Sequence, residues 1–395
     1  MAREIVGLFA GIGGIERGLH SAGFETTFLC EKDERAKAVL SARFPSVPIS
    51  DDVQTLESIP KCDLVSAGFP CQDLSQAGLK VGIDGKESGL VEHLFRVLNA
   101  LTPADRPTWI LIENVSYILN LHAGKAMNYL TQSLEELGYA WAYRVIDARA
   151  FGIPQRRQRM LLVASKDHDV RDVLFSTNID VQPIDDSIGE IDESLGYGFY
   201  WTEGLRGLGW TPNGIPTLKI GSKIGIPSPP AIWVPSDNFF GTPDVRDAER
   251  LQGFPEDWTV CVEGLPNARR GDRWHMVGNA VCVPVSEWIG KQLTNPKKYL
   301  VERQKPLKNK RWPRAAWGAK GQRFEMDMSM WPVNNTYKPI LEFLRYPLKP
   351  LSIKGASGFY NRAKKSKLIR YPDRFLKSLE MYIEKISEEG AVNGN

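Results

Sequence analysis

The first 165 residues alternate short apolar runs with amphipathic segments, and this alternation restricts the fold more than any other feature of the chain. The apolar runs are predicted to be strands over residues 4–9, 26–30, 64–67, 109–112, 142–147 and 160–164. The amphipathic segments are predicted to be helices over residues 14–22, 34–44, 90–101 and 126–137. Strands and helices that alternate at this spacing are typical of a parallel sheet covered by helices on both faces. In such sheets, ligands bind beyond the carboxyl ends of the strands.

Composition excludes several classes of protein. With 395 residues, 42% hydrophobic and 25% charged, the chain can bury a sizeable core. It has no apolar stretch long enough to cross a membrane and no signal peptide, so we expect a cytoplasmic protein. The five cysteines form no CxxC pair and the five histidines are scattered, so neither a disulfide framework nor a metal site is predicted.

Charge is distributed unevenly along the chain. Residues 296–395 carry 22 Lys and Arg against 9 Asp and Glu, whereas residues 1–295 carry 28 against 38. A basic C-terminal quarter favours a polyanionic partner, with nucleic acid the leading candidate. A solvated, Lys-rich extension would give the same count, so charge alone leaves both interpretations open. Residues 166–243 are rich in Gly, Pro and aromatic residues and predict a smaller, loop-rich domain.

A glycine-rich turn directly follows the first strand and has the sequence Phe9-Ala-Gly11-Ile-Gly13-Gly14. Glycines let the backbone approach a ligand closely, and the N-terminus of the next helix offers free N–H groups. Glu16 stands where a dinucleotide fingerprint needs its last glycine, so the turn suggests a nucleoside without a pyrophosphate. Glu31 ends the second strand, where a carboxylate can accept from both ribose hydroxyls, and Asp52 could meet an adenine amino group. Either acid alone could equally be an ordinary loop residue.

A cysteine follows the next strand in the segment Gly68-Phe69-Pro70-Cys71-Gln72. A thiolate is a good nucleophile only where positive or polar neighbours lower its pKa, and taken alone Cys71 could also be a small buried hydrophobe. The four glycines that follow, between residues 73 and 90, are typical of a loop that closes over a substrate.

Two further polar segments lie at strand ends. Glu113 closes the fourth predicted strand in the sequence Glu113-Asn114-Val115. The run Gln155-Arg156-Arg157-Gln158-Arg159 opens the last one. Since alternate residues of a strand share a face, Arg157 and Arg159 are predicted to point together into one site.

Six motifs occur in a fixed order: FxGxGG, GFPCQ, ENV, QRRQR, then RLQGFP from Arg250 and GNAV from Gly278. Together they resemble the DNA (cytosine-5)-methyltransferase family, of the bacterial or phage restriction–modification type, over about residues 4–165 and 244–292. The resemblance implies an α/β fold: a Rossmann-like S-adenosylmethionine-dependent methyltransferase sheet, a smaller loop-rich target recognition domain and a basic C-terminal extension. By this division, residues 1–165 and 270–299 form the catalytic domain, 166–269 the recognition domain and 300–395 the extension.

The resemblance also implies a role for each matched residue. Cys71 would attack C6 of a flipped-out cytosine, Glu113 would hold or protonate N3, and Arg159 with Arg157 would anchor the base. S-adenosylmethionine would be bound by Phe9, Gly11, Gly13, Gly14, Glu31, Asp52, Pro70, Leu90 and Asn279. The products would be a C5-methylated cytosine and S-adenosylhomocysteine, with no metal. The implied partners are double-stranded DNA and a separately encoded restriction endonuclease, and the chain would act as a monomer.

Two other functions are weighed against this one. A tRNA cytosine-5 methyltransferase would carry Pro-Pro-Cys-Gln, where this chain has Phe69-Pro-Cys-Gln. An inactive DNA-binding homologue would lack the Cys, Glu or Arg motifs, and all are present. The chain departs from the family at Gly7, where many members have Asp, and at Lys32, where some have Trp. The sequence does not predict which DNA site is recognised.

Overall fold

The computed structural model describes residues 3–69, 89–180, 186–219, 228–269, 271–308 and 311–392 of the chain. These residues form two compact units. The first comprises Met1–Phe151, Gln158–Val181 and Ala280–Asn334, and the second comprises Gly152–Arg157, Gln182–Asn279 and Asn335–Asn395. The division differs from the predicted one, because residues 300–395 contribute to both units instead of forming a region of their own.

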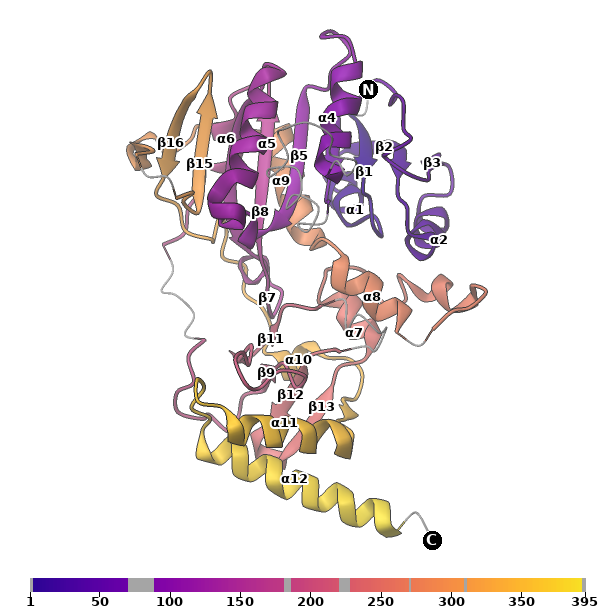
Figure 1. The fold of residues 1–395 in the computed structure, drawn as a ribbon, viewed down its shortest axis with the longest axis vertical. Helices are drawn as coiled ribbons and strands as arrows, with labels where there is room; N and C mark the ends of the chain where they lie inside the picture. The colour runs from indigo at the N-terminus through magenta and orange to yellow at the C-terminus, as the bar shows by residue number, and fades with distance from the viewer. Residues whose placement is uncertain are drawn as a thin grey trace. The chain divides into compact units, whose positions relative to one another are not determined.

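The first unit is built on one large sheet with the strand order β14-β16-β15-β6-β8-β5-β4-β1-β2-β3 (Figure 1). Its strands are β1 Arg3–Leu8, β2 Phe24–Cys30, β3 Ile49–Ser50, β4 Leu64–Ala67, β5 Trp109–Val115, β6 Ala140–Asp147, β8 Gln158–Ser165, β14 Gln304–Pro306, β15 Ala315–Ala319 and β16 Gln322–Met326. Strands β1 to β5 pair in parallel, as predicted from the alternation. All six predicted strands are present, with ends that differ by up to three residues.

The prediction of a parallel sheet is wrong for β8, which runs antiparallel to both β5 and β6. A parallel connection needs a crossover of about a dozen residues or more, usually a helix. Only residues 148–157 link β6 to β8, and they hold a short 3₁₀ turn and the two-residue strand β7 (Gln155–Arg156). The link is therefore too short to return the chain to the other end of the sheet.

Helices cover both faces of this sheet. Helices α4 (Leu90–Ala100) and α5 (Lys125–Glu136) bury an apolar face against alternate residues of the strands, among them Val6, Val65 and Ile110. Helices α1 (Gly14–His20) and α9 (Val283–Thr294) pack closely together, since a Cβ at Gly290 would lie 3.1 Å from Leu19 Cδ2. The first unit also contains α2 (Glu34–Arg43), which Asp33 caps, and α6 (Val170–Leu174). The four predicted helices are thus confirmed within one to two residues at each end.

The C-terminal third extends the sheet beyond β6. Strand β15 pairs antiparallel with β6, and β16 and β14 follow in turn. Because seven of the eight β6 residues are buried, a bare β6 edge would expose an apolar strand that invites unwanted pairing. Residues 304–326, which the sequence placed in a basic extension, therefore complete the main sheet.

The second unit has a small antiparallel sheet of β9 (Tyr197–Phe199), β10 (Thr211–Pro212), β12 (Ala231–Val234), β13 (Phe239–Thr242) and β17 (Lys349–Pro350). Strand β11 (Ile215–Pro216) pairs with β7. The described helices of the second unit are α7 (Val245–Arg250), α8 (Asp272–Asn279), α10 (Ile340–Phe343), α11 (Ile353–Lys365) and α12 (Asp373–Val392).

Aromatic side chains form the core of the second unit. Phe199, Trp233 and Phe240 from the small sheet are fully buried, as are Phe359 of α11 and Phe375 of α12. Figure 1 shows α11 and α12 lying along this sheet. The aromatic residues of 166–243 thus build a core with the C-terminal helices. No helix among the described residues is long and apolar enough to cross a membrane.

Candidate cofactor and catalytic site

The glycine turn after β1 has a left-handed backbone that glycine adopts at little cost. Gly11 and Gly13 have φ values of 57° and 80°, and Phe9 has a φ of 56°. A Cβ at Gly13 would also collide with the Phe44 ring, whereas a Cβ at Gly11 would meet no atom of the described residues within 4 Å. The turn therefore requires glycine at position 13 for two reasons and leaves open space beside Gly11.

Glu31, at the end of β2, holds this turn. One carboxylate oxygen accepts from the Gly11 N–H at 2.8 Å, and the other accepts from the backbone N–H groups of Lys32 and Asp33, both at 2.8 Å. Asp52, after β3, pairs with Lys32 at 2.8 Å. Burial raises the pKa of Asp52, but Lys32 and the Gln54 N–H together hold that pKa below its ordinary value. Lys32 thus contacts Asp52, one of the residues predicted to bind the nucleoside.

Asn114 positions the segment that leads to the predicted nucleophile. Its side-chain amide donates to the Phe69 carbonyl at 3.0 Å, and its oxygen accepts from the Val115 N–H at 2.9 Å. The Phe69 ring packs edge-to-face on Phe9, with ring centres 5.9 Å apart. The sequence predicts no role for Asn114, and its position directly after Glu113 is the one signal that points to it.

Pro70 and Cys71, together with the glycine-rich loop up to residue 88, lie outside the described residues. Leu90, the first residue of α4, is half-buried and packs against the core of the first unit. The predicted contact of Leu90 with a cofactor stays a prediction.

Glu113 and Arg159 form an ion pair. The Arg159 Nε lies 3.1 Å from Glu113 Oε1, and both side chains are largely buried. The two residues come from the antiparallel neighbours β5 and β8, where Val115 is opposite Arg159 and Glu113 precedes Val115 by two residues. This diagonal register places an acid and a base together at the carboxyl end of β5.

The prediction that Arg157 shares a strand face with Arg159 is wrong. Strand β8 begins at Gln158, and Arg157 falls between it and β7, which pairs with β11. Arg157 belongs to the second unit, where it is buried and its guanidinium donates to the Leu218 carbonyl at 3.4 Å. Asn279 also belongs to the second unit, as the exposed last residue of α8. The roles of both stay predictions.

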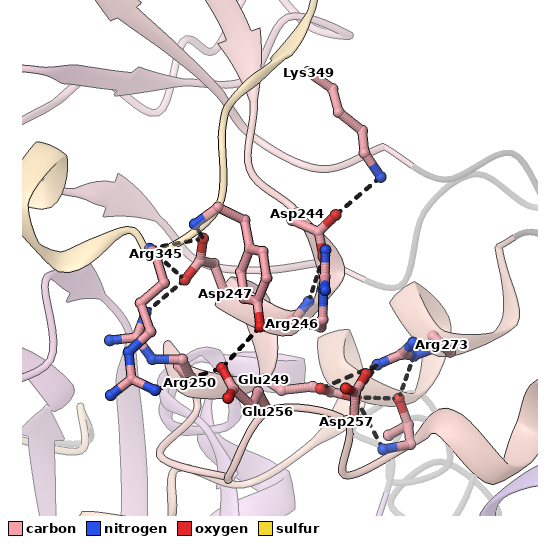
Figure 2. Close-up of polar contacts among 12 residues, drawn as sticks. Asp244, Arg246, Asp247, Glu249, Arg250, Glu256, Asp257, Arg273, Arg345 and Lys349 are labelled. Carbon is pink, nitrogen blue, oxygen red and sulfur yellow. Dashed lines mark hydrogen bonds and ion pairs between the residues drawn. The ribbon is translucent and has the colours of Figure 1, made fainter.

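Charged groups around α7 hold the second unit together (Figure 2). The fully buried Asp247 accepts from the backbone N–H groups of Arg345 and Tyr346, both at 3.0 Å, and pairs with Arg250 at 2.5 Å. The buried Glu249 pairs with Arg273 at 3.0 Å. Arg250, the first residue of the RLQGFP motif, therefore contributes to the packing of this unit through its pair with Asp247.

Comparisons with known proteins agree with the fold and the motifs. The model of the C-5 cytosine-specific DNA methylase family matches residues 4–195 and 244–295. The chain belongs to this family. Among its relatives, the Type II methyltransferase M2.BsuMI of Bacillus subtilis is 52% identical over 95% of this chain and 97% of its own length. The Type II methyltransferase M.NlaX of Neisseria lactamica is 30% identical over 73% of this chain and 96% of its own length.

Solved structures support the same fold. The Schizosaccharomyces pombe Dnmt2 methyltransferase matches with a TM-score of 0.54 and 18% identity, over 74% of this chain and 98% of that one. The chain is thus a C-5 cytosine-specific DNA methylase with an α/β methyltransferase fold. No cluster of three or more His, Cys, Asp or Glu that could hold a metal occurs among the residues that the structure describes.

Proposed function

We propose that this methylase transfers a methyl group from S-adenosylmethionine to C5 of a cytosine within a specific sequence of double-stranded DNA. The observation that carries the proposal is the Glu113–Arg159 pair beside Asn114, which anchors the segment leading to Cys71. Three of the family's motifs thereby meet at the ends of β4, β5 and β8.

The residues around the glycine turn fit S-adenosylmethionine. The left-handed turn leaves space beside Gly11, and Glu31 and Asp52 present carboxylates at the ends of neighbouring strands. Glu31 would accept from the ribose hydroxyls and Asp52 from the adenine amino group. Phe9, Gly13, Gly14, Pro70, Leu90 and Asn279 would complete the site. When bound, S-adenosylmethionine supplies the methyl group.

The protein side chains would activate the cytosine in two stages. The Cys71 thiolate attacks C6 and forms a C–S bond, while Glu113 donates a proton to N3, so that the electron pair of the C5–C6 bond becomes available at C5. After C5 accepts the methyl group, loss of the C5 proton to a base restores the double bond and expels Cys71. Arg159, and Arg157 by the sequence match, would hold the flipped base, whose C6 is shielded while it is stacked in the duplex.

The names of the relatives suggest the biological role. Since M2.BsuMI and M.NlaX are Type II methyltransferases, we infer that this chain is the modification enzyme of a restriction–modification system. A separately encoded endonuclease would then cut the same DNA sequence when it is unmethylated. The chain would act on DNA as a monomer.

The proposal is tested by bisulfite sequencing of DNA from cells that express the chain, beside a Cys71→Ala control. We expect protected cytosines within one short sequence, and none in the control. Protection that persists in the control would contradict the role of Cys71. Absence of protection in well-expressed protein, together with labelled methyl transfer to total RNA, would favour the tRNA methyltransferase instead.

A further inference from the structure

Glu16 is a buried acid to which the mechanism assigns no role. It lies in the first turn of α1, directly after the glycine turn, and only 1% of its surface is exposed. Its Oε1 accepts from the hydroxyl of Ser66, a fully buried residue of β4, at 2.8 Å. Its Oε2 is also buried and has no hydrogen-bond partner among the described residues. A buried polar atom without a hydrogen-bond partner lowers the stability of the fold, so the presence of an acid at this position needs an explanation.

The carboxyl group of Glu16 lies over strand β1 of the large sheet. A Cβ added at Gly7 of β1 would collide with Glu16 Oε1 and would lie 2.8 Å from Leu29 Cδ2. In the sheet register, Gly7 is opposite Ser66 of β4 on one side and Leu29 of β2 on the other. Glu16 therefore occupies the space that a side chain at position 7 would fill, and it reaches the neighbouring strand.

The Glu16–Ser66 bond connects two parts of the proposed site. On one side, Glu16 is fixed by the helix to the turn that contains Gly11 and Gly13. On the other, Ser66 precedes Phe69 by three residues on the strand that leads toward Cys71. The edge-to-face contact of Phe9 with Phe69 is a second connection between the same two segments.

The surroundings of Glu16 favour its uncharged form. Burial raises the pKa of Glu16 from 4.5 to about 7, while hydrogen bonds from its own backbone N–H and from Ser66 lower that pKa and the charge of Glu31 raises it. The charged neighbour that acts on it is Glu31, directly after β2; β4 contributes the Ser66 hydroxyl, and on β1 the residue beneath it is Gly7, which has no side chain. No described cation pairs with Glu16, so its ionisation would leave a buried charge without a counter-ion.

We propose that Glu16 is a positioning residue of the cofactor site, which as an uncharged carboxylic acid holds the glycine turn against β4. The inference rests on the proposed function, because it assumes that the turn binds S-adenosylmethionine. The ionised carboxylate could still accept from Ser66, but it would be a buried charge without a described counter-ion, so ionisation of Glu16 destabilises the arrangement that holds the turn.

Binding of S-adenosylhomocysteine, measured by calorimetry between about pH 6 and about pH 8, tests this role. This probe lacks the sulfonium charge of S-adenosylmethionine, so attraction between that charge and an ionised Glu16 cannot contribute to the pH dependence. We expect the Kd of the wild-type protein to rise about fivefold or more across this range. Glu16→Gln keeps the size and the acceptor for Ser66 but cannot ionise, so its Kd should stay low throughout. Glu16→Ala should bind weakly at every pH, and Glu25→Gln, an exposed change on β2, should behave as wild type.

A second measurement uses the free protein. The folded-state pKa of Glu16 lies above the unfolded value, so its stabilising effect is complete below about pH 4.5 and is lost as the pH rises to about 7. The Tm of the wild type should therefore fall relative to that of Glu16→Gln over this range.

Three outcomes would overturn the inference. Wild-type affinity in Glu16→Ala would show that the connection to Ser66 does not matter for the turn. A wild-type pH profile in Glu16→Gln would show that another group titrates. Failure of the wild-type protein to bind the probe at any pH would contradict the proposed function itself, and the Glu16 role with it.

Discussion

Asn114 determines the position of Phe69, and thereby where the chain enters the segment that contains Cys71. Its side-chain amide donates a hydrogen bond to the Phe69 carbonyl, and the residue is only 3% exposed. In Asn114→Asp, a carboxylate would face that carbonyl, and two acceptors would repel each other. We expect kcat to fall about 100-fold, because small displacements of a reacting group have effects of this size. The Kd for S-adenosylhomocysteine should change little, since the Glu31–Gly11 contact is retained.

Single-turnover methyl transfer and calorimetry separate these two effects. Asn99→Asp, the same change at an exposed position of α4, serves as the control. Equal losses in kcat and in cofactor affinity would show that Asn114 supports the whole fold of the first unit and has no specific effect on the Cys71 segment.

The motifs identified individual residues, but not the contacts among them. Glu113 and Arg159 could be selected from strand ends, and the structure pairs them. Gly7 could be recognised only as a departure from the family, since nothing in a linear sequence shows that Glu16 fills the space above it. The position of Arg157 could not be predicted from the periodicity of a strand, because β8 begins one residue later, at Gln158.

At the level of elements, α12 belongs to the core of the second unit and is not a solvated tail. Phe375 is fully buried among rings from the small sheet and from α11, including Trp233, Phe240 and Phe359. Phe375→Ala should lower the free energy of unfolding by about 3–5 kcal/mol, as is usual for a buried ring. Met381→Ala, on the same helix but 52% exposed, should change it by less than about 0.5 kcal/mol. Denaturant unfolding measures both, and equal effects would mean that α12 does not pack as described.

Elements fixed by local pattern were predictable, and those fixed by distant contacts were not. Helix α4 could be located because its apolar residues recur at helical spacing, and β1 because it is short and apolar before a glycine turn. Strand β15 is different, because its place depends on pairing with β6, about 170 residues earlier in the chain. No periodicity within residues 315–319 indicates that partner. The direction of β8 likewise depends on the length of a connection, which the alternation of strands and helices does not reveal.

Across the whole molecule, the basic residues that are concentrated in one quarter of the sequence do not form one region of the fold. The basic residues of 296–395 are distributed over both units, and some have structural partners: Arg303 pairs with Asp180 at 2.6 Å, and Arg374 with Glu193 at 2.9 Å. Others are exposed on and just after α11, namely Lys364, Lys365, Lys367 and Arg370, although Lys364 also lies 3.9 Å from Glu380 and over the Tyr360 ring. The two interpretations of the basic region, nucleic-acid contact and solvated surface, therefore concern this second group.

If the exposed lysines contact phosphates, their removal should weaken DNA binding through the release of fewer counter-ions. Each contact that is lost should reduce the slope of log K against log salt concentration by about 0.9. The triple variant Lys364→Gln, Lys365→Gln and Lys367→Gln should therefore bind less tightly at low salt, with a slope lower by about 2 to 3. The DNA sequence that is methylated should stay the same, because phosphate contacts carry no base information.

The matched control replaces three exposed lysines of the first unit, Lys61, Lys125 and Lys291, by Gln. Both variants change the net charge of the protein equally, so a general effect of charge would shift the two slopes together. A reduced slope only in the α11 variant would locate phosphate contacts on the second unit. An unchanged slope in that variant would show that its lysines are solvated surface, and that the contacts with DNA backbone lie elsewhere.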